Sequence, residues 1–258
     1  MNPTSTLIKS SGSTVEIDAA GVYYRDLNTV LRDVVANDAQ HIKLLNVCGQ
    51  RYIGTDLDRP VNIEIHGTPG NDLGAFMDGP RIKVYGNAQD GLANTMNEGE
   101  IVVHGRAGDI AGFAMRGGKV FVRDNVGYRV GIHMKQYLSK VPCLVIGGTA
   151  QHFLGEYMAG GTLIVLGLNL KEGEDHKANF IGTGMHGGVM YIRGGVKPHQ
   201  LGKEVGVVEL DDQDRANLER LVGEFANHFG YDASKILAGN FIKLVPLSLR
   251  PYGRLYAY

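Results

Sequence analysis

The feature that most constrains the fold is a repeat of about 19 residues between Ile63 and Gly194. Each copy passes through turn residues, a small residue, a methionine, one or two glycines and a short apolar strand. The methionines set the register: the first four are 19 residues apart, and the last two follow after 24 and 27, giving Met77, Met96, Met115, Met134, Met158 and Met185. A column of small residues runs beside them: Gly74, Ala93, Gly112, Gly131, Gly155 and Gly182. Internal periods of this length predict a solenoid.

The apolar end of each copy predicts a short strand with one buried face, since two positions of each strand stay apolar with one residue between them. The expected strands cover residues 61–65, 81–85, 100–104, 119–123, 144–146, 162–166 and 189–193. A 19-residue unit is too long for one straight strand, so glycine-containing turns must fold each coil back on itself. Successive coils then stack about 4.8 Å apart with parallel pairing, which predicts a mainly β fold, a parallel β-helix. Methionine suits the gaps beside tight corners, so the methionine column is interpreted as core.

The middle residue of each strand points out of the coil and forms a second column. It begins with Glu64 and Lys83 and then becomes apolar, through Val102, Phe121, Val145, Ile164 and Tyr191. An exposed apolar row of this length is normally covered. We therefore expect the C-terminal segment or a partner subunit to lie across these five residues.

The regions on either side of the repeat predict three parts: a strand–helix–strand unit over residues 1–60, the β-helix over 61–205, and a helix with an extended tail over 206–258. The first helix is expected from Asp26, as its cap, to Val35. The last is expected to follow Asp211-Asp212 and to end at about His228, with Gly230 as its stop signal. Both flanking units are candidates to cap the open ends of the solenoid. Two insertions between copies, at 136–140 and within 168–177, are expected to form loops that either bind a partner or are simply solvated.

Composition argues against several classes of function. The formal net charge is −1 and no run of Lys or Arg occurs, so nucleic acid is not an expected partner. No apolar run approaches the roughly 18 residues of a membrane span, and no signal peptide is recognisable. Two cysteines 95 positions apart favour reduced thiols in a cytoplasmic protein.

No catalytic, cofactor-binding or metal-binding residue is predicted in this chain. His66 and His104 share one column but lie two coils apart, roughly 9–10 Å by the stacking repeat, so they cannot bind one zinc ion. The glycine pairs, such as Gly117-Gly118, precede strands instead of helices, so they do not form a phosphate-binding loop. Acid–base catalysis by aspartates at the corners, as in polysaccharide lyases, stays open as an alternative.

The repeat resembles a known family. Residues 86–91 (GNAQDG), 105–112 (GRAGDIAG) and 115–120 (MRGGKV) are similar to the GXGXG repeat, which marks the C-terminal β-helix domain of the glutamate synthase large subunit and is shared by one of the subunits of formylmethanofuran dehydrogenase. The flanks at 17–28, 46–54 and 246–252 look like the stand-alone domain-3 subunits of glutamate synthase in archaea and some bacteria. Related subunits occur in N-methylglutamate synthase. The resemblance implies a right-handed coil.

The resemblance also implies a function. In that family the β-helix holds no catalytic residue, and the glutaminase nucleophile, the FMN and the iron–sulfur clusters belong to other domains. This chain would then be a scaffold without activity of its own, in an oxidoreductase complex of glutamate biosynthesis and nitrogen metabolism. Its partners would be a class II glutamine amidotransferase subunit and an FMN-binding synthase subunit, and a homo-oligomer is a further expectation. The alternatives are the equivalent scaffold of a formylmethanofuran dehydrogenase complex and a β-helix enzyme with a groove site.

Overall fold

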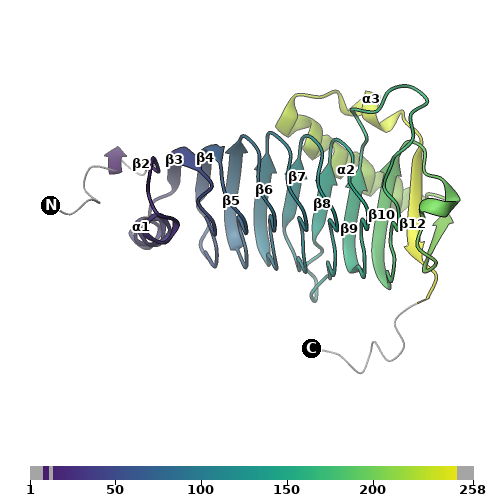
Figure 1. Ribbon diagram of the computed structural model, residues 1–258, viewed down its shortest axis with the longest axis horizontal. Helices are drawn as coiled ribbons and strands as arrows, with labels where there is room; N and C mark the ends of the chain where they lie inside the picture. Colours follow the sequence, from purple (N-terminus) through teal and green to yellow (C-terminus); the bar gives the residue numbers. More distant parts are fainter. Residues whose placement is uncertain (1–7, 12–13, 249–258) are drawn as a thin grey trace.

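The structure is a computed structural model that describes residues 8–11 and 14–248. The chain forms a row of stacked coils whose strands make one sheet of 12 strands in the order β1 to β10, then β12, then β11 (Figure 1). The strands are β1 Ile8–Ser11, β2 Thr14–Asp18, β3 His41–Cys48, β4 Asn62–Thr68, β5 Asp78–Tyr85, β6 Glu98–Val103, β7 Lys119–Val122, β8 Cys143–Ile146, β9 Ala159–Val165, β10 Gly187–Arg193, β11 Val205–Val208 and β12 Phe241–Pro246. The helices are α1 Tyr24–Ala36, α2 Asp212–Phe229 and α3 Ala233–Leu237. The predicted mainly β solenoid is confirmed.

The coils stack in the register that the repeat predicts. From β2 to β10 neighbouring strands pair in parallel, and equivalent residues of successive copies face each other. One inward column shows this for seven strands: Ile63, Ile82, Ile101, Val120, Leu144, Leu163 and Met190. The core is therefore a ladder of like side chains along the stack.

The methionine and glycine columns line the inside of the coils. All six methionines of the repeat are at most 1% exposed. The residues of the small column have positive φ, from +59° at Ala93 to +73° at Gly112, which favours glycine. Their inner side also leaves no room: a Cβ on Gly155 would lie 2.5 Å from the Met190 sulfur. Glycine is thus selected here both by backbone conformation and by the packed strand opposite.

In two further columns most residues adopt the left-handed backbone although they are not glycine, and glycine occupies one position of each, at Gly91 and Gly184. One contains Asp72, Ile110, Arg129, Phe153 and Phe180, and the other contains Phe76, Thr95, Ala114, His133 and Tyr157, all with φ between +50° and +64°. Aromatic and β-branched residues rarely take this conformation. The corner geometry of the coil therefore overrides the residue preference, and the sequence pattern alone does not reveal it.

Side-chain oxygens also connect the corners of adjacent coils. The carboxylate of Asp90 accepts a hydrogen bond from the backbone N–H of Asp109 at 2.8 Å, and the carboxylate of Asp109 accepts one from Tyr128 at 2.8 Å. Asn87 and Asn125 do the same for Arg106 and Thr149. These bonds satisfy donors that the short strands leave unpaired, so the corner aspartates have a structural role.

Both ends of the stack are covered. At the first end, α1 buries Leu27 and Leu31 in the core, and β2 and β3 continue the sheet into β4 in parallel. The helix begins at Tyr24, with Tyr23 at the cap position, so the expected cap at Asp26 is wrong. Asp26 lies instead in the first turn, where its negative charge interacts favourably with the helix dipole. At the other end β12 pairs with β10 antiparallel and β11 pairs with β12.

The C-terminal helix lies along the outer side of the strands. α2 begins with a capping box between Asp211 and Asp214 and ends at Gly230, whose φ is +74°. Its apolar stripe faces the sheet, and in Figure 1 it is the helix behind β7 to β10. Among the described residues, no helix combines the length and the apolar character needed to cross a membrane.

Candidate functional site

The outward column of the strands is covered by this chain itself. Val102, Phe121, Val145, Ile164 and Tyr191 are between 0% and 4% exposed. They form a second core with α2 and α3, to which the helices contribute Leu218, Leu221, Val222, Phe225 and Ile236. These five strand residues are therefore part of the interior, and none of them is accessible to another protein.

Polar contacts fix α2 at both ends of this second core. The hydroxyl of Tyr191 donates to the Asp214 carboxylate at 2.5 Å, and Lys243 from β12 pairs with the same carboxylate. Burial and the neighbouring Asp214 carboxylate raise the pKa of Tyr191 far above its usual range. Burial acts to raise the pKa of Asp214, but hydrogen bonds from Lys243 and Tyr191 outweigh it and lower that pKa below its usual value. Farther along α2, Lys119 binds Glu224 at 2.6 Å.

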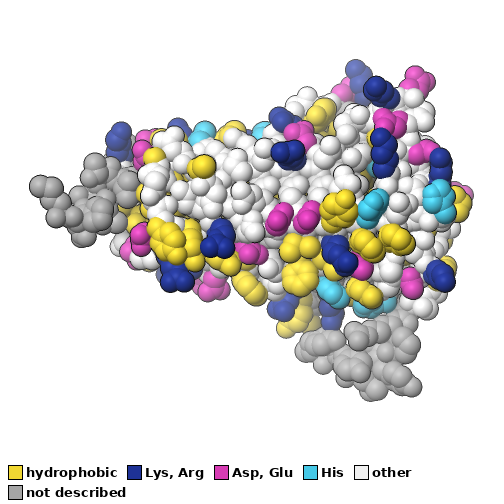
Figure 2. Space-filling model, viewed as in Figure 1, with side chains coloured by type: hydrophobic (Ala, Val, Ile, Leu, Met, Phe, Trp, Pro, Cys, Tyr) yellow, Lys and Arg dark blue, Asp and Glu magenta, His cyan; other side chains and the backbone are white. Residues whose placement is uncertain are grey.

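The opposite side of the stack carries an uncovered set of aromatic side chains, which we term the aromatic face. Its members come from the corners of the coils: Phe76, Phe113, Tyr128, His133, His152, Phe153, Tyr157 and Phe180. The most exposed are Phe76, Tyr128, Tyr157 and Phe180, at 44% to 54%. Figure 2 shows hydrophobic side chains interleaved with charged and histidine side chains on the side turned away from α2. Exposed apolar patches larger than a few hundred Å² often mark a contact surface.

Rings of adjacent coils stack on this face. The rings of His133 and Tyr157 lie 5.4 Å apart and almost parallel, at 10°. Phe153 and Phe180 are stacked in the same way at 4.8 Å and 13°. Arg129 lies over the Phe153 ring at 4.7 Å and pairs with the buried carboxylate of Glu156. Apart from Phe76, each ring of the face contacts a ring of an adjacent coil, so most of this surface is preformed.

The aromatic face was not predicted from the sequence. A signal was present, since Phe76, His133 and Tyr157 each precede a methionine of the repeat by one residue. The column is interrupted by Thr95 and Ala114, and alternation along a strand says nothing about the direction of a left-handed corner residue. The clustering follows only from the coil geometry.

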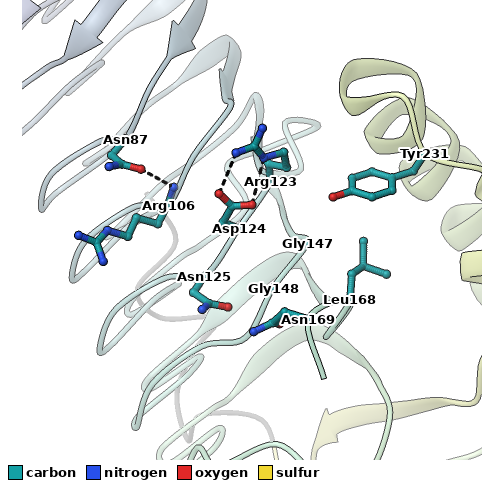
Figure 3. A pocket seen from close by; sticks show the side chains of 10 residues that line it. All are labelled: Asn87, Arg106, Arg123, Asp124, Asn125, Gly147, Gly148, Leu168, Asn169 and Tyr231. Carbon is teal, nitrogen blue, oxygen red and sulfur yellow. Dashed lines mark hydrogen bonds and ion pairs between the residues drawn. The ribbon is translucent and has the colours of Figure 1, made fainter. Parts of the chain in front are cut away.

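A polar cleft of about 420 Å³ lies where the corners after the strands meet the turn between α2 and α3 (Figure 3). Arg123 binds Asp124 through two contacts of 3.0 Å, and Tyr231 reaches toward them from the helical side. Among the described residues, the guanidinium of Arg106 has no hydrogen bond or ion pair. The cleft therefore holds one unpaired positive charge, which suits a carboxylate of a partner protein or a small anion.

Beside this cleft, His66, Tyr85 and His104 form a ladder of stacked rings. Tyr85 lies 4.7 Å from His66 and 5.3 Å from His104, and Phe229 of α2 meets His104 edge-on. The intervening tyrosine keeps the two histidines from sharing an ion. Burial, aided by nearby positive charges, lowers the pKa of His104. Across residues 8–11 and 14–248, no group of three or more His, Cys, Asp or Glu side chains is arranged to hold a metal ion.

The two insertions lie at opposite edges of the sheet, because 136–140 precedes the start of β8 and 168–177 follows the end of β9 (Figure 1). The first is a small hairpin bridged between Tyr137 and Lys140, with Leu138 at its tip 78% exposed. The second is fixed by the buried His176, whose Nε2 lies 2.9 Å from the carbonyl of Arg193. Both loops are anchored, and their tips project from the stack.

Comparison with known proteins agrees with this architecture. The family described as "GXGXG motif" matches residues 29–247, which include α1 in part, all coils and the C-terminal cover. An uncharacterized protein of Methanocaldococcus jannaschii is 49% identical over 251 residues, covering 94% of this chain and 96% of its own length. The similarity thus extends over the flanking units as well as the repeat.

Proposed function

Because this chain belongs to the GXGXG motif family, we propose that it is the non-catalytic scaffold subunit of a glutamate synthase-type complex. The main supporting observation is that the family match spans residues 29–247, which contain the β-helix and the C-terminal segments that pack on it. The chain holds a class II glutamine amidotransferase subunit against an FMN-binding synthase subunit. Ammonia released by the first of these partners then reaches 2-oxoglutarate at the second. FMN and iron–sulfur clusters reside in the partners.

The physical properties of the stack support this role. Parallel pairing runs without a break from β2 to β10, and a continuous core fills the coils. Bending such a stack would break many pairings at once, so two bound proteins keep a fixed separation. Ion pairs add to this rigidity, as between Arg129 and Glu156 of adjacent coils and between Lys119 and Glu224 under α2.

The placement of the two insertion loops supports a bridge between two different partners. The hairpin at 136–140 presents an apolar tip, with Tyr137 and Leu138 both exposed, which suits a pocket on one partner. The loop at 168–177 presents charged residues, including Lys171 and Glu172, which suit a polar surface on the other. Since the loops project from opposite edges of the sheet, one partner does not obstruct the other.

Reconstitution tests the proposal. The chain is co-expressed with the glutaminase-type and FMN-synthase-type subunits of the same organism, and the complex is purified through a tag on this chain. Amide-¹⁵N glutamine is supplied with unlabelled ammonium and a reductant, and ¹⁵N in glutamate reports direct transfer. We expect most of the product to carry ¹⁵N with the chain present, and dilution by the unlabelled pool without it. Equal labelling in both reactions would reject the scaffold role.

Two variants localise the contacts. Tyr137→Ser with Leu138→Ser is expected to weaken binding of one partner at least about tenfold, since buried aromatic and aliphatic anchors carry most interface energy. Lys171→Glu with Glu172→Lys is expected to weaken the other. Tyr23→Ser is the control, since this exposed tyrosine lies at the first end of the stack, away from both loops. Co-purification with molybdenum- or tungsten-containing proteins instead would favour the formylmethanofuran dehydrogenase alternative.

A further inference from the structure

The aromatic face has no cover among the described residues, although the other side of the stack is covered by α2. Four of its rings are about half exposed. At 150–250 Å² for a whole aromatic side chain, these four alone expose roughly 400 Å² of surface. This lies within the range of about 300–600 Å² for the largest apolar patch of a typical monomer, which is often a contact surface. Thr95 and Ala114 separate Phe76 from the other rings, so the exposed rings form a row along the stack.

The chain leaves the described part of the structure beside this face. The backbone N–H of Leu247 donates to the carbonyl of Glu204 at 2.8 Å, and the carboxylate of Glu204 accepts from the backbone of Gly184 at 3.0 Å. Gly184 in turn lies against the Tyr157 ring, since a Cβ on it would be 2.3 Å from that ring. Only two residues, Glu204 and Gly184, therefore separate the end of β12 from Tyr157 on the aromatic face.

The remaining chain is long enough to cover the face. Eleven residues follow Leu247, and extended chain reaches about 3.3 Å per residue, roughly 36 Å in all. From the coil of Gly184 back to that of Phe76 the stack advances five coils, about 24 Å at a spacing of about 4.8 Å. Every ring of the face thus lies within reach.

The composition of this segment matches the surface. Residues 249–258 read LRPYGRLYAY, with two arginines, three tyrosines and two leucines. Arginine and tyrosine pack well on the exposed faces of aromatic rings. Proline at 251 reduces the entropy lost on ordering the segment.

We propose that residues 249–258 bind along the aromatic face of their own chain, passing Tyr157 and His133 in the direction of Phe76. The segment covers the side of the solenoid that α2 leaves open, so both sides of the stack are covered by C-terminal residues. This proposal does not depend on the scaffold function.

Limited trypsin digestion of the full-length chain tests it, since the segment contains one good site. Arg250 precedes proline and resists trypsin, so cleavage after Arg254 removes residues 255–258 and is read by intact mass. Two variants are compared with the unmodified chain. Tyr157→Asn with His133→Asn removes two rings, and asparagine tolerates their positive φ. Tyr256→Ser with Tyr258→Ser changes only the segment, so it leaves the folded coils intact.

We expect cleavage after Arg254 to be at least about tenfold faster in both variants than in the unmodified chain, because proteolysis follows the population of the released segment. Tyr52→Asn is the matched control. This exposed tyrosine also has positive φ, +62°, but lies at the first end of the stack, and its variant should be cut at the unmodified rate. Equal rates in all four proteins would overturn the proposal. If protection from trypsin increased with protein concentration, the proposal would also be overturned, because the segment would then bind the aromatic face of a second copy of the chain.

Discussion

Replacing Phe225 by alanine should weaken the attachment of α2 to the solenoid. This side chain is fully buried at the centre of the second core. Its ring packs over Gly147, where an added Cβ would lie 2.6 Å from the ring, and it contacts Phe229 and Tyr231 at centroid distances of 4.8 Å and 5.8 Å. The ring of Phe225 therefore occupies the space that the missing side chain of Gly147 leaves open, and removing the ring should leave a cavity there.

The expected cost is about 4 kcal/mol. A buried phenylalanine side chain removes roughly 150–250 Å² from water, worth about 4–6 kcal/mol at ~25 cal/mol per Å². Measured Phe→Ala substitutions in cores cost about 3–5 kcal/mol. Since every ~1.4 kcal/mol is tenfold in an equilibrium, opening of α2 should become about a thousandfold more frequent.

Hydrogen exchange measured by mass spectrometry checks this prediction. Amides of α2 should exchange about a thousandfold faster, while those of β6 to β9 change less, because their pairing is with neighbouring coils. Tyr23→Ala, at an exposed position on the first end of the stack, should change stability by less than about 0.5 kcal/mol. An increase of less than tenfold in α2 would refute the assignment of Phe225 as its main apolar anchor.

The two cores and the buried His176 give three further predictions. Phe121→Asp with Ile164→Asp places charges under α2 and should prevent folding or lower the urea midpoint sharply, whereas a stable double variant would contradict the second core. Gly155→Ala should lower the free energy of unfolding in urea by about 2–4 kcal/mol, because the backbone there is left-handed and the Met190 sulfur is close. Ala93→Gly should change stability far less. Equal losses of stability in the two variants would argue against steric selection of glycine. Burial lowers the pKa of His176, so the unfolded chain binds a proton at higher pH than the folded chain does, and stability falls as the pH drops through about 6.5. His176→Gln should therefore reduce the difference between the urea midpoints measured at about pH 8 and pH 5.5. An unchanged difference would exclude His176 as a contributor.

The sequence was enough to predict the stack, because residues one repeat apart in the chain become neighbours in adjacent coils. A fixed interval between methionines identifies the residues that face each other in adjacent coils, and alternation in each strand identifies the buried side. This information was sufficient for the inward column from Ile63 to Met190. It also identified an outward column that requires a cover, since five apolar residues in a row are unfavourable in water.

The candidate site was much less predictable. The sequence left open whether the outward column is covered by the C-terminal segment or by a partner protein, because either supplies apolar surface. It gave only an interrupted signal for the aromatic face, whose rings are brought together by left-handed corner residues such as His133 and Tyr157. The cleft at Arg106 and Tyr231 joins residues 125 positions apart and depends on where α2 ends.

The amino-acid sequence by itself determined the coil, its period and its buried face, because contacts between equivalent residues of adjacent coils repeat at a constant separation along the chain. Only the tertiary structure decided which outer surfaces are covered and which stay open. That choice depends on the path of α2 and β12 over the stack, and this path follows from single contacts, such as Phe225 over Gly147 and Tyr191 with Asp214, that no repeat encodes.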